Sequence, residues 1–423
     1  MNKSSQINQY ADKIKLSKNS SLLTSLFKRM FLKKMKSISY GYLTIIDNNK
    51  TLSFGNSNHS LSAKVEILSP EFYVLLGSGG DLGVAEAYIA GYWKSKDLVE
   101  LLQIVIKNQA FLKELDSGIV KLFKPINYFI HRNRQNTLLG SKKNILAHYD
   151  LSNDFYSLWL DPTMTYSSAI FEPEGITLQE ASIEKLDRIC RKLDIKNEDK
   201  IIEIGSGWGS FAIHAAKKYV CKITTTTISD AQYKYVKSLI KKEGLEDKIE
   251  LLNKDYRNLT GQFDKLVSIE MIEAVGNNFM KNYFNAISKL VKSNGLILIQ
   301  GITYNDQGFK LYKNNVDFIK KYIFPGSCLI SLENIMGIIK NNTDLALVHL
   351  EDITMHYAET LYQWRQSFYD SKERVESLGF SKAFINMWEY YFVYCEAGFL
   401  ERKIGDVQMV FAKSGSRNIK IKF

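Results

Sequence analysis

Three glycines at alternate positions follow a short apolar run in "IIEIGSGWGS", residues 201–210. An apolar run, a glycine-rich turn and an amphipathic stretch in that order predict a buried strand, a tight turn and a helix, and glycine there lets the backbone approach a ligand closely. A dinucleotide-binding turn, G-x-G-x-x-G, needs its third glycine at position 210, where this chain has Ser210. The spacing of Gly205, Gly207 and Gly209 therefore predicts a turn for a different nucleotide-like ligand.

The pattern around this turn, E-x-G-x-G-x-G, resembles motif I of class I S-adenosylmethionine (SAM) methyltransferases. The resemblance implies that the turn holds the carboxylate and ribose of SAM and that the glutamate of the motif pairs with its ammonium group. "TISDAQ" ends the next predicted strand, where the ribose or adenine should lie, and "KDYRNL" ends the third strand near the adenine. A generic glycine-rich turn of an α/β domain is the alternative. The predicted SAM-binding residues of these stretches are Glu203, Ile204, Gly205, Ser206, Gly207, Trp208, Gly209, Thr227, Gln232, Tyr256 and Arg257.

Five further stretches occur in order along the chain and together resemble the cyclopropane-fatty-acyl-phospholipid synthases and their mycobacterial relatives that act on mycolic acids. The stretches are "HYDLSNDFYSLWLDPTMTYSSAIF" (148–171), "SIEMIEAVG" (268–276), "FIKKYIFPG" (318–326), "MHYAETLYQWRQSF" (355–368) and "YYFVYCEAGFLERKIGDVQ" (390–408). The resemblance covers at least residues 145–412. The first 125 residues resemble, with less distinctive motifs, the amino-terminal lipid-binding domain of that family.

The resemblance implies that the SAM methyl is transferred to a carbon of a cis double bond in a phospholipid acyl chain. The resulting carbocation then loses a proton to a bound bicarbonate ion and closes to a cyclopropane ring. The family's catalytic positions fall on Cys395, Glu273, Tyr357, Gln300 and Ser168, and two more SAM contacts fall on Tyr166 and Ser167. Ser168 stands where many members have cysteine, and Gln300 stands where many have histidine; glutamine can hydrogen-bond an anion but cannot take a proton.

A different outcome on the same alkene, such as a methylated or methylene-branched chain, shares the carbocation and stays open. A protein of another class, which binds lipid or nucleic acid with degenerate catalysis, is the third hypothesis. The net charge of +11 favours a polyanionic partner, either nucleic acid or an anionic membrane surface. The base-methylation motif Asn/Asp-Pro-Pro-aromatic is missing after the fourth predicted strand, and no cysteine follows a proline. We therefore predict an anionic phospholipid bilayer as partner and no nucleic acid.

Apolar and basic residues interleave at helical spacing in residues 22–34, which predicts a cationic amphipathic helix that either packs on its own domain or contacts a membrane surface. The four cysteines are scattered without metal-ligand spacing, so no metal is expected. The first twenty residues lack the apolar centre of a signal peptide, and no apolar stretch approaches the ~18 residues of a spanning helix. We expect a cytoplasmic enzyme, peripherally associated with the inner face of the membrane; a homodimer fits the family.

Strand and helix patterns alternate after residue 180, with strands near "KIIEIG", "KITTTTI", "IELLN", "FDKLVSI" and "GLILIQGI". This alternation predicts an α/β fold, a doubly wound and mostly parallel Rossmann-like sheet of the SAM-methyltransferase type. The amino-terminal part mixes half-buried strands with helices and predicts a small α+β domain. The predicted organisation is a lipid-binding domain at 1–125, a basic linker at 126–147 and a catalytic domain at 148–423.

Overall fold

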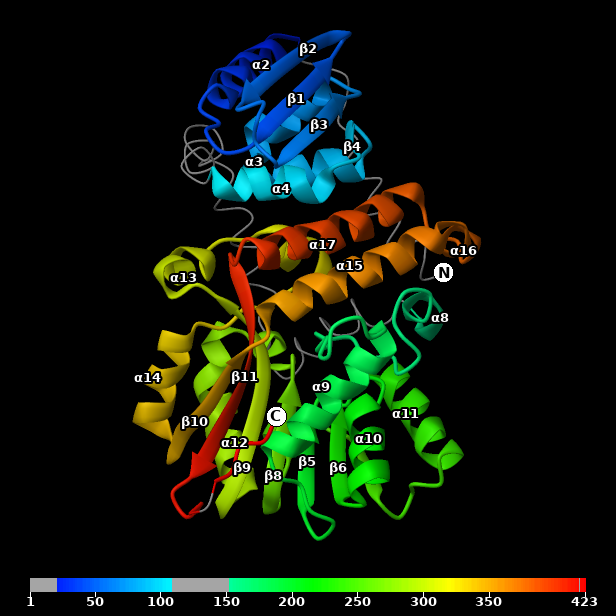
Figure 1. Cartoon of the computed structure of the whole chain (residues 1–423), viewed down its shortest axis with the longest axis vertical. Helices are drawn as coiled ribbons and strands as arrows, with labels where there is room; N and C mark the ends of the chain where they lie inside the picture. Colours follow the sequence, from blue (N-terminus) through cyan, green and yellow to red (C-terminus); the bar gives the residue numbers. More distant parts are fainter. Residues whose placement is uncertain (1–20, 109–151, 418) are drawn as a thin grey trace. The chain divides into compact units, whose positions relative to one another are not determined.

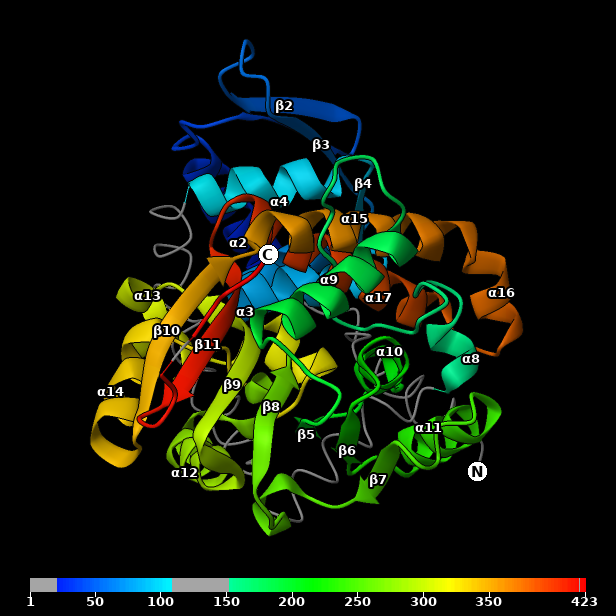
Figure 2. The ribbon, with the colours of Figure 1, turned by 60° about the horizontal axis from the view of Figure 1, so that its bottom comes forward.

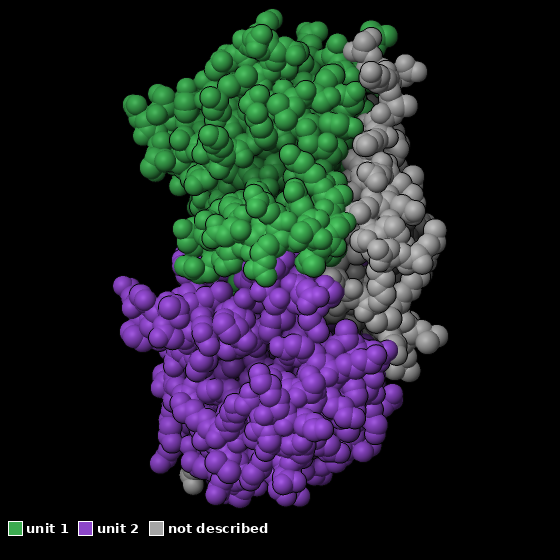
Figure 3. All heavy atoms as spheres, turned by 90° about the vertical axis from the view of Figure 1, so that its right-hand side faces the viewer, with its two compact units in different colours: residues 1–130, 315–323, 361–403 green, residues 131–314, 324–360, 404–423 purple. Residues whose placement is uncertain are grey.

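The computed structural model describes residues 21–108, 152–417 and 419–423. Contacts along the chain define two compact units, shown in different colours in Figure 3. Unit 1 comprises residues 1–130, 315–323 and 361–403, and unit 2 comprises residues 131–314, 324–360 and 404–423. Two carboxy-terminal segments thus group with the amino-terminal elements, an exchange that the predicted domain boundaries did not include. The predicted linker at 126–147 lies outside the described residues.

Unit 2 is built on a seven-stranded sheet with the order β10-β11-β9-β8-β5-β6-β7 (Figure 1). The strands from β9 to β7 are parallel, whereas β11 runs antiparallel to β9 and β10 antiparallel to β11. This confirms the predicted fold class and the five predicted strands; β10 and β11 were not predicted. The strands are β5 (Lys200–Ile204), β6 (Lys222–Thr227), β7 (Ile249–Asn253), β8 (Phe263–Ile269), β9 (Val291–Tyr304), β10 (Leu345–Asp352) and β11 (Ile404–Lys413).

Helices cover both faces of this sheet because successive apolar strand residues point to opposite sides. Ile201 packs into a core with α9 (Leu178–Lys192), α10 (Ser210–Tyr219) and α11 (Asp230–Lys242). Ile202 packs into a second core with α12 (Met280–Leu290) and α14 (Leu332–Asn342), and the two helix layers are seen in Figure 2. Helix α9 begins at a capping box in which Thr177 and Glu180 satisfy each other's backbone amides.

Shorter elements at the carboxyl ends of the strands complete unit 2. Helix α15 begins there and continues into unit 1. These elements are α8 (Asn153–Tyr156), η1 (Tyr256–Asn258), η2 (Ile272–Val275), η3 (Asn277–Phe279), α13 (Asp306–Tyr312) and α15 (Thr354–Asp370).

Unit 1 contains a four-stranded mixed sheet of order β2-β1-β3-β4 with helices packed against it, the predicted small α+β arrangement. The long α17 packs on α3 and α4, and Glu401 just beyond it accepts a hydrogen bond from Gln103 at 2.8 Å. Among the described residues, no helix combines the length and apolarity needed to cross a bilayer. The elements are α2 (Ser21–Met35), β1 (Tyr42–Asp47), β2 (Lys50–Gly55), β3 (Ser62–Ile67), α3 (Glu71–Ile89), β4 (Trp93–Ser95), α4 (Leu98–Lys107), η4 (Ile319–Ile323), α16 (Lys372–Ser377) and α17 (Lys382–Leu400).

Candidate active site

The glycine-rich turn lies at the carboxyl end of β5, the edge at which doubly wound sheets bind ligands. Gly205, Gly207 and Gly209 have φ values of +93°, +51° and +92°, a left-handed backbone that strongly favours glycine. A Cβ atom on Gly207 would meet nothing within 4 Å, so the backbone of the turn borders open space. A Cβ atom on Gly205 would lie 3.0 Å from the side chain of Met271, in the loop after β8. The turn is therefore shaped to bring its backbone against a ligand.

Glu203, the last residue but one of β5, is buried below this turn. Its Oε2 accepts a hydrogen bond of 2.5 Å from the hydroxyl of Thr225. Burial raises the pKa of Glu203 to about 7, and the nearby Lys185 ammonium opposes that rise. A buried carboxylate beside an open glycine turn is suited to pair with the ammonium group of an amino-acid ligand, so the residues present fit SAM.

The remaining predicted SAM-binding residues follow neighbouring strands at the same edge. Thr227 ends β6 and donates a 3.0 Å hydrogen bond to Oε1 of Gln232 in α11. Arg257 in η1, beyond β7, lies 5.5 Å from the ring centre of Tyr256 and pairs with Asp255 at 2.6 Å. The side chain of Ile204 is buried in the sheet, and the amide of Ser206 donates to the carbonyl of Thr226.

Aromatic residues from the 148–171 stretch lie against the turn. The ring of Trp208 lies 4.7 Å from that of Tyr156 and 6.5 Å from that of Tyr166, and its Nε1 donates to Asn153 at 2.8 Å. The ring of Phe324 lies 6.4 Å from that of Tyr166. The structure thus brings Tyr166, predicted to contact SAM, next to the turn that the glycines form.

A second group of polar residues lies after β8, the strand beside β5. Glu270 directly follows β8 with φ of +47°, a strained value for a residue with a side chain. Its Oε1 accepts hydrogen bonds of 2.8 Å from the Ser168 backbone amide and 2.8 Å from Nε2 of Gln300, and its Oε2 accepts one of 2.6 Å from the Tyr357 hydroxyl. We call Glu270, Glu273 and Asp406, with the side chains that bind them, the acid cluster.

The other two carboxyl groups of the acid cluster are less well satisfied. Glu273 accepts a hydrogen bond from the backbone amide of Ile302, but its Oε2 is buried without a partner. Asp406 in β11 accepts one from Gln300 at 3.1 Å, and its Oδ1 is likewise buried without a partner. Burial, followed by the charge of Glu270, raises the pKa of Glu273 to about 8, and the same causes raise the pKa of Asp406 well above its usual range. Glu273 is therefore held largely in the neutral form at pH 7, and the pKa of Asp406 is shifted in the same direction.

Glu270 differs because three donors converge on it. Burial raises its pKa, whereas the hydrogen bonds from Tyr357, the Ser168 amide and Gln300, together with the Lys185 ammonium, lower it. Donors to a carboxylate favour its ionised form. The pKa of Glu270 is raised overall, because burial outweighs the donors. With three donors, Glu270 is nevertheless the best-satisfied carboxylate of the acid cluster.

Lys185 of α9 is the buried cation that faces these acids. Its ammonium donates to the hydroxyl of Ser167 at 2.8 Å. Burial lowers the pKa of Lys185 to about 8, although Glu270, Asp406, Asp161 and Glu203 all oppose that shift. One ammonium therefore lies among four carboxyl groups, of which Glu270 has the most hydrogen-bond donors. In the described part of the chain, no group of three or more His, Cys, Asp or Glu is arranged to hold a metal ion.

The orientation of the Gln300 amide is set from a distance. The buried Lys192 ammonium can only donate, and it donates to Oε1 of Gln408 at 2.7 Å. Gln408 must then present its amide nitrogen to Oε1 of Gln300, at 3.0 Å. The nitrogen of Gln300 is consequently directed at Glu270 and Asp406. This chain of donors explains how a glutamine at this position supports a carboxylate.

Bicarbonate, which the family resemblance implied, does not fit this arrangement. The amide of Ser168, the nitrogen of Gln300 and the hydroxyl of Tyr357 all donate to the carboxylate of Glu270 instead. The hydroxyl of Ser168 donates to the carbonyl of Ala169 at 2.9 Å. Glu273 was expected to orient the ion as a carboxylate, but its raised pKa leaves it largely protonated. The residues assigned to the ion are brought together as predicted, around a side chain of the protein.

Sequence reasoning missed Glu270, Asp406, Lys185 and Gln408. Glu270 stands in the stretch "SIEMIEAVG", in which only the second glutamate was assigned a role. An acidic residue directly after an apolar strand marks the ligand-binding edge of a parallel sheet, and this signal was present. Lys185 also left one, because it lies four residues from both Ala181 and Ile189 on the buried face of α9. Asp406 and Gln408 lie on β11, which was not predicted.

Cys395 lies on α17 in unit 1. Burial, followed by the negative charge of Asp317, raises the pKa of its thiol. A thiol with a raised pKa stays protonated at neutral pH and is a poor nucleophile. Cys395 is the partly exposed one of the four cysteines, and its assigned catalytic role stays a prediction.

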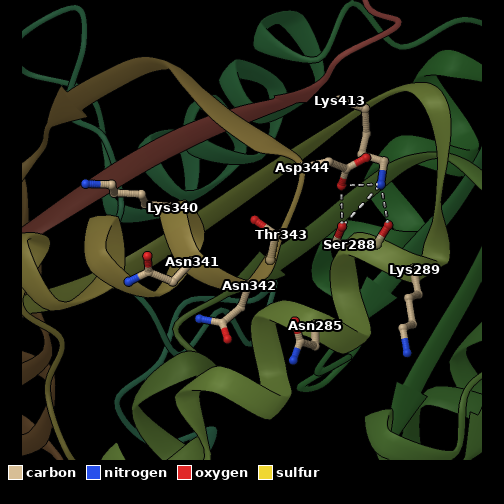
Figure 4. Close-up of a pocket in the computed structure, with 9 residues that line it drawn as sticks. All are labelled: Asn285, Ser288, Lys289, Lys340, Asn341, Asn342, Thr343, Asp344 and Lys413. Carbon is tan, nitrogen blue, oxygen red and sulfur yellow. Dashed lines mark hydrogen bonds and ion pairs between the residues drawn. The ribbon is translucent and has the colours of Figure 1, made fainter.

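A hollow elsewhere in unit 2 has a different character. It has a volume of about 440 Å³ and contains none of the predicted site residues (Figure 4). Lys413, Asp344 and Ser288 bond one another there, with the Lys413 ammonium 2.6 Å from Asp344. The lining residues are Asn285, Ser288, Lys289, Lys340, Asn341, Asn342, Thr343, Asp344 and Lys413.

Comparisons with known proteins identify the family and agree with the fold. Residues 137–409 match the family described as mycolic acid cyclopropane synthetase. Tuberculostearic acid methyltransferase UfaA1 of Mycobacterium tuberculosis is 34% identical over 348 residues, which are 80% of this chain and 81% of that protein. Cyclopropane-fatty-acyl-phospholipid synthase of Escherichia coli K12 is 30% identical over 372 residues, 86% of this chain and 91% of that protein. The structure of mycolic acid cyclopropane synthase CmaA1 complexed with SAH and CTAB has a TM-score of 0.60 and 28% identity, over 64% of this chain and 98% of that one.

The mostly parallel sheet and the glycine turn after β5 define a SAM-dependent methyltransferase of Rossmann-like fold. The family match covers more than half of the chain, and two relatives are at least 30% identical over most of their length. The chain belongs to the mycolic acid cyclopropane synthetase family.

Proposed function

We propose that this enzyme transfers the SAM methyl group to a cis double bond in an unsaturated phospholipid acyl chain, with a cyclopropane ring as the product. The observation that carries the proposal is the position of the acid cluster at the end of β8, beside the glycine turn at the end of β5. The glycine turn and the carboxylate of Glu270 thus lie at one edge of the sheet, as an alkylation followed by proton removal requires.

When bound, SAM supplies an electrophilic methyl group. The glycine turn and Glu203 would hold its amino-acid portion, and Thr227, Gln232 and Tyr256 lie where its ribose and adenine are expected. An alkene is a weak nucleophile, so the chain's contribution is to hold it in a near-attack pose and to exclude water that would trap a cation. An ionised carboxylate on Glu270, at the end of the strand beside the glycine turn, would favour positive charge in the transition state.

Methylation or methylenation of the same alkene, giving a branched chain, is the second candidate. The relative with 34% identity is named a methyltransferase, whereas the relative with 30% identity is named a cyclopropane synthase. Another relative, from Gibberella zeae, is named sphingolipid C9-methyltransferase 2 and is 29% identical over 61% of this chain and 51% of that protein. Both outcomes need a base beside the new methyl group, so the acid cluster serves either. A saturated branch also needs a reductant, which the reaction proposed here does not supply.

Mass spectrometry of fatty-acid methyl esters from an expressing bacterial strain tests the proposal. A gain of one methylene unit in unsaturated chains supports it, and loss of the double bond without an exocyclic alkene supports the cyclopropane over the branched product. Retention of RNA by the purified protein through washes with high salt, without any lipid product, would favour the non-catalytic alternative.

The partner that we propose is an anionic phospholipid bilayer, contacted by α2. This helix has two apolar rows, and the residues within each row are four positions apart. Phe27 and Phe31 of the first row are buried in unit 1, whereas Leu22, Leu26 and Met30 of the second row are 86%, 48% and 45% exposed. Exposed basic residues interleave with the second row, namely Arg29, Lys33 and Lys36. An exposed apolar row flanked by cations is suited to the boundary between headgroups and acyl chains.

Sedimentation with vesicles tests this contact. Binding should be stronger with anionic than with neutral lipid and should weaken with salt, because exposed charges are screened over about 8 Å at physiological ionic strength. The variant Leu26→Ser should weaken binding, whereas Leu68→Ser removes a similarly exposed leucine outside α2 and should not. Equal binding to both vesicle types would refute the proposal. The family resemblance adds the expectation of a homodimer at the inner face of the membrane, which light scattering and cell fractionation test.

A further inference from the structure

We infer that the carboxylate of Glu270 takes the place of bicarbonate and is the proton acceptor of this enzyme. The inference rests on the proposed alkylation of an alkene and names the base for that reaction. It also explains how a glutamine serves at position 300, where many members of the family carry histidine.

The first argument is the convergence of donors. Three residues that the family resemblance assigned to a bound anion, 168, 300 and 357, donate to one side chain at 2.6–2.8 Å, the first of them through its backbone amide. They come from three separate parts of the chain, so their convergence is a built site for a carboxylate. An anion held by the protein itself needs no binding step and cannot dissociate during turnover.

The second argument is that this carboxylate has unused hydrogen-bond acceptor capacity. An ionised carboxylate offers about four lone-pair sites. Oε1 of Glu270 accepts two hydrogen bonds, from Ser168 and Gln300, whereas Oε2 accepts one, from Tyr357. Among these three bonds, Oε2 therefore keeps a lone pair for an incoming proton, and Asp406 is a further side-chain hydrogen-bond partner of Glu270. Glu270 is also partly exposed, while Gln300 and Ser168 are fully buried, so the carboxylate residue borders accessible space.

The third argument is the division of roles among the acids. Glu273 and Asp406 each bury an oxygen without a partner, which suits a neutral carboxylic acid better than an anion. The three donors on Glu270 favour its ionised form over that of the other two. Environments that push neighbouring carboxyl groups apart in this way separate a base from groups that stay protonated.

The step balances without a further reagent. A π electron pair of the alkene forms a carbon–carbon bond to the SAM methyl as the carbon–sulfur bond breaks and S-adenosylhomocysteine leaves. Oε2 of Glu270 then takes a proton from the new methyl group, and the electron pair of that carbon–hydrogen bond closes the ring onto the cationic carbon. In the branched alternative, a hydride shift moves the cation to the methylated carbon, and the same electron pair forms an exocyclic double bond.

The test compares the full-length enzyme with Glu270→Gln and Glu270→Ala on vesicles of dioleoyl phosphatidylglycerol, in buffer freed of carbon dioxide and with bicarbonate added back. The rate of the parent enzyme should differ by less than about twofold between buffer without bicarbonate and buffer with bicarbonate added back. Both variants should lose roughly 10²–10⁴-fold, the usual contribution of a general base. Glu270→Ala leaves the three donors without their carboxylate, so bicarbonate or formate should restore its rate at least about tenfold by mass action. The exposed control Glu246→Gln should behave as the parent.

Binding gives a readout that does not depend on turnover. The ¹³C resonance of bicarbonate should broaden with Glu270→Ala and stay sharp with the parent enzyme, so this comparison tests Glu270 even if the vesicles yield no alkylated lipid. Absence of any alkylated lipid with the parent would overturn the proposed function alone. A parent enzyme that needs bicarbonate or binds it, or a Glu270→Gln variant with near-normal turnover, would overturn the role of Glu270. If the alanine variant does not fold, the glutamine variant and the parent decide the question.

Discussion

The glycine turn after β5 and the acid cluster after β8 lie at the ends of adjacent parallel strands, yet they are built in opposite ways. The turn is made of consecutive residues from Glu203 to Gly209, and its conformation follows from local glycines. The acid cluster draws Ser168, Glu270, Gln300, Tyr357 and Asp406 from five elements or loops. The first site binds a ligand shared by many methyltransferases, whereas the second specialises the reaction. A local motif can therefore persist while the chemistry beside it changes.

The largest effect is expected at the turn. Gly207→Val places a β-branched residue at φ +51° and fills the open space beside the backbone, so it should abolish SAM binding. Gly244 is the matched control, because it has φ +65° and open surroundings far from the turn along the chain. Calorimetry with SAM should show no binding for Gly207→Val and parent-like binding for Gly244→Val. Micromolar affinity of Gly207→Val for SAM would contradict the assignment of the turn as the SAM-binding site.

A smaller effect is expected from one donor of the acid cluster. Tyr357→Phe removes the hydrogen bond to Glu270 Oε2, which typically costs about 1–3 kcal/mol, or roughly ten- to a hundredfold in rate. Because that bond lowers the pKa of Glu270, its loss should also raise this pKa and move the acid limb of the pH–rate profile to higher pH. Tyr362→Phe, an exposed tyrosine of the same helix, should leave the profile unchanged. The affinity of Tyr357→Phe for SAM should stay near that of the parent. A large loss of SAM affinity would contradict the view that the glycine turn and the acid cluster act independently.

The free energy of unfolding should depend on pH because Glu273 of the acid cluster has a raised pKa. Glu273 has its pKa raised from 4.5 to about 8 by burial and by Glu270, so the folded state binds more protons than the unfolded state between those values. The free energy of unfolding should therefore fall as pH rises through this window, by up to about 1.4 kcal/mol per pH unit for this group. Urea unfolding at about pH 6 and about pH 8 should give a flatter dependence for Glu273→Gln than for the parent. An unchanged slope would contradict a neutral Glu273.

The smallest effect is expected at Ser168. Its backbone amide, which alanine keeps, donates to Glu270, and its hydroxyl donates only to the adjacent carbonyl of Ala169 among the hydrogen bonds described. The rate of Ser168→Ala should stay within about threefold of the parent, in line with the loss of one neutral hydrogen bond. A loss of tenfold or more would indicate that the hydroxyl contacts the reacting groups, as the family resemblance implied.

Much of the fold was predictable because it rests on local patterns. Short apolar runs predict the parallel strands, and glycines at fixed spacing predict the turn. The strands β10 and β11 were missed, because β10 exposes most of its side chains and β11 follows directly on a long helix. The role of Glu270 was missed for a different reason. Its meaning depends on donors 102, 30 and 87 positions away, which only the folded chain brings together.

The antiparallel pairing of β9 with β11 has a consequence for the order in which parts of the enzyme fold. Tyr304 pairs with Ile404, so this contact closes a loop of a hundred residues, at an entropic cost of about 4 kcal/mol that must be met before the contact stabilises the chain. Asp406 and Gln408 arrive with that pairing, whereas the glycine turn needs only the strands around β5. Contacts so distant along the chain form slowly. During refolding, the enzyme is therefore expected to bind SAM before the Gln300 amide is fixed in place.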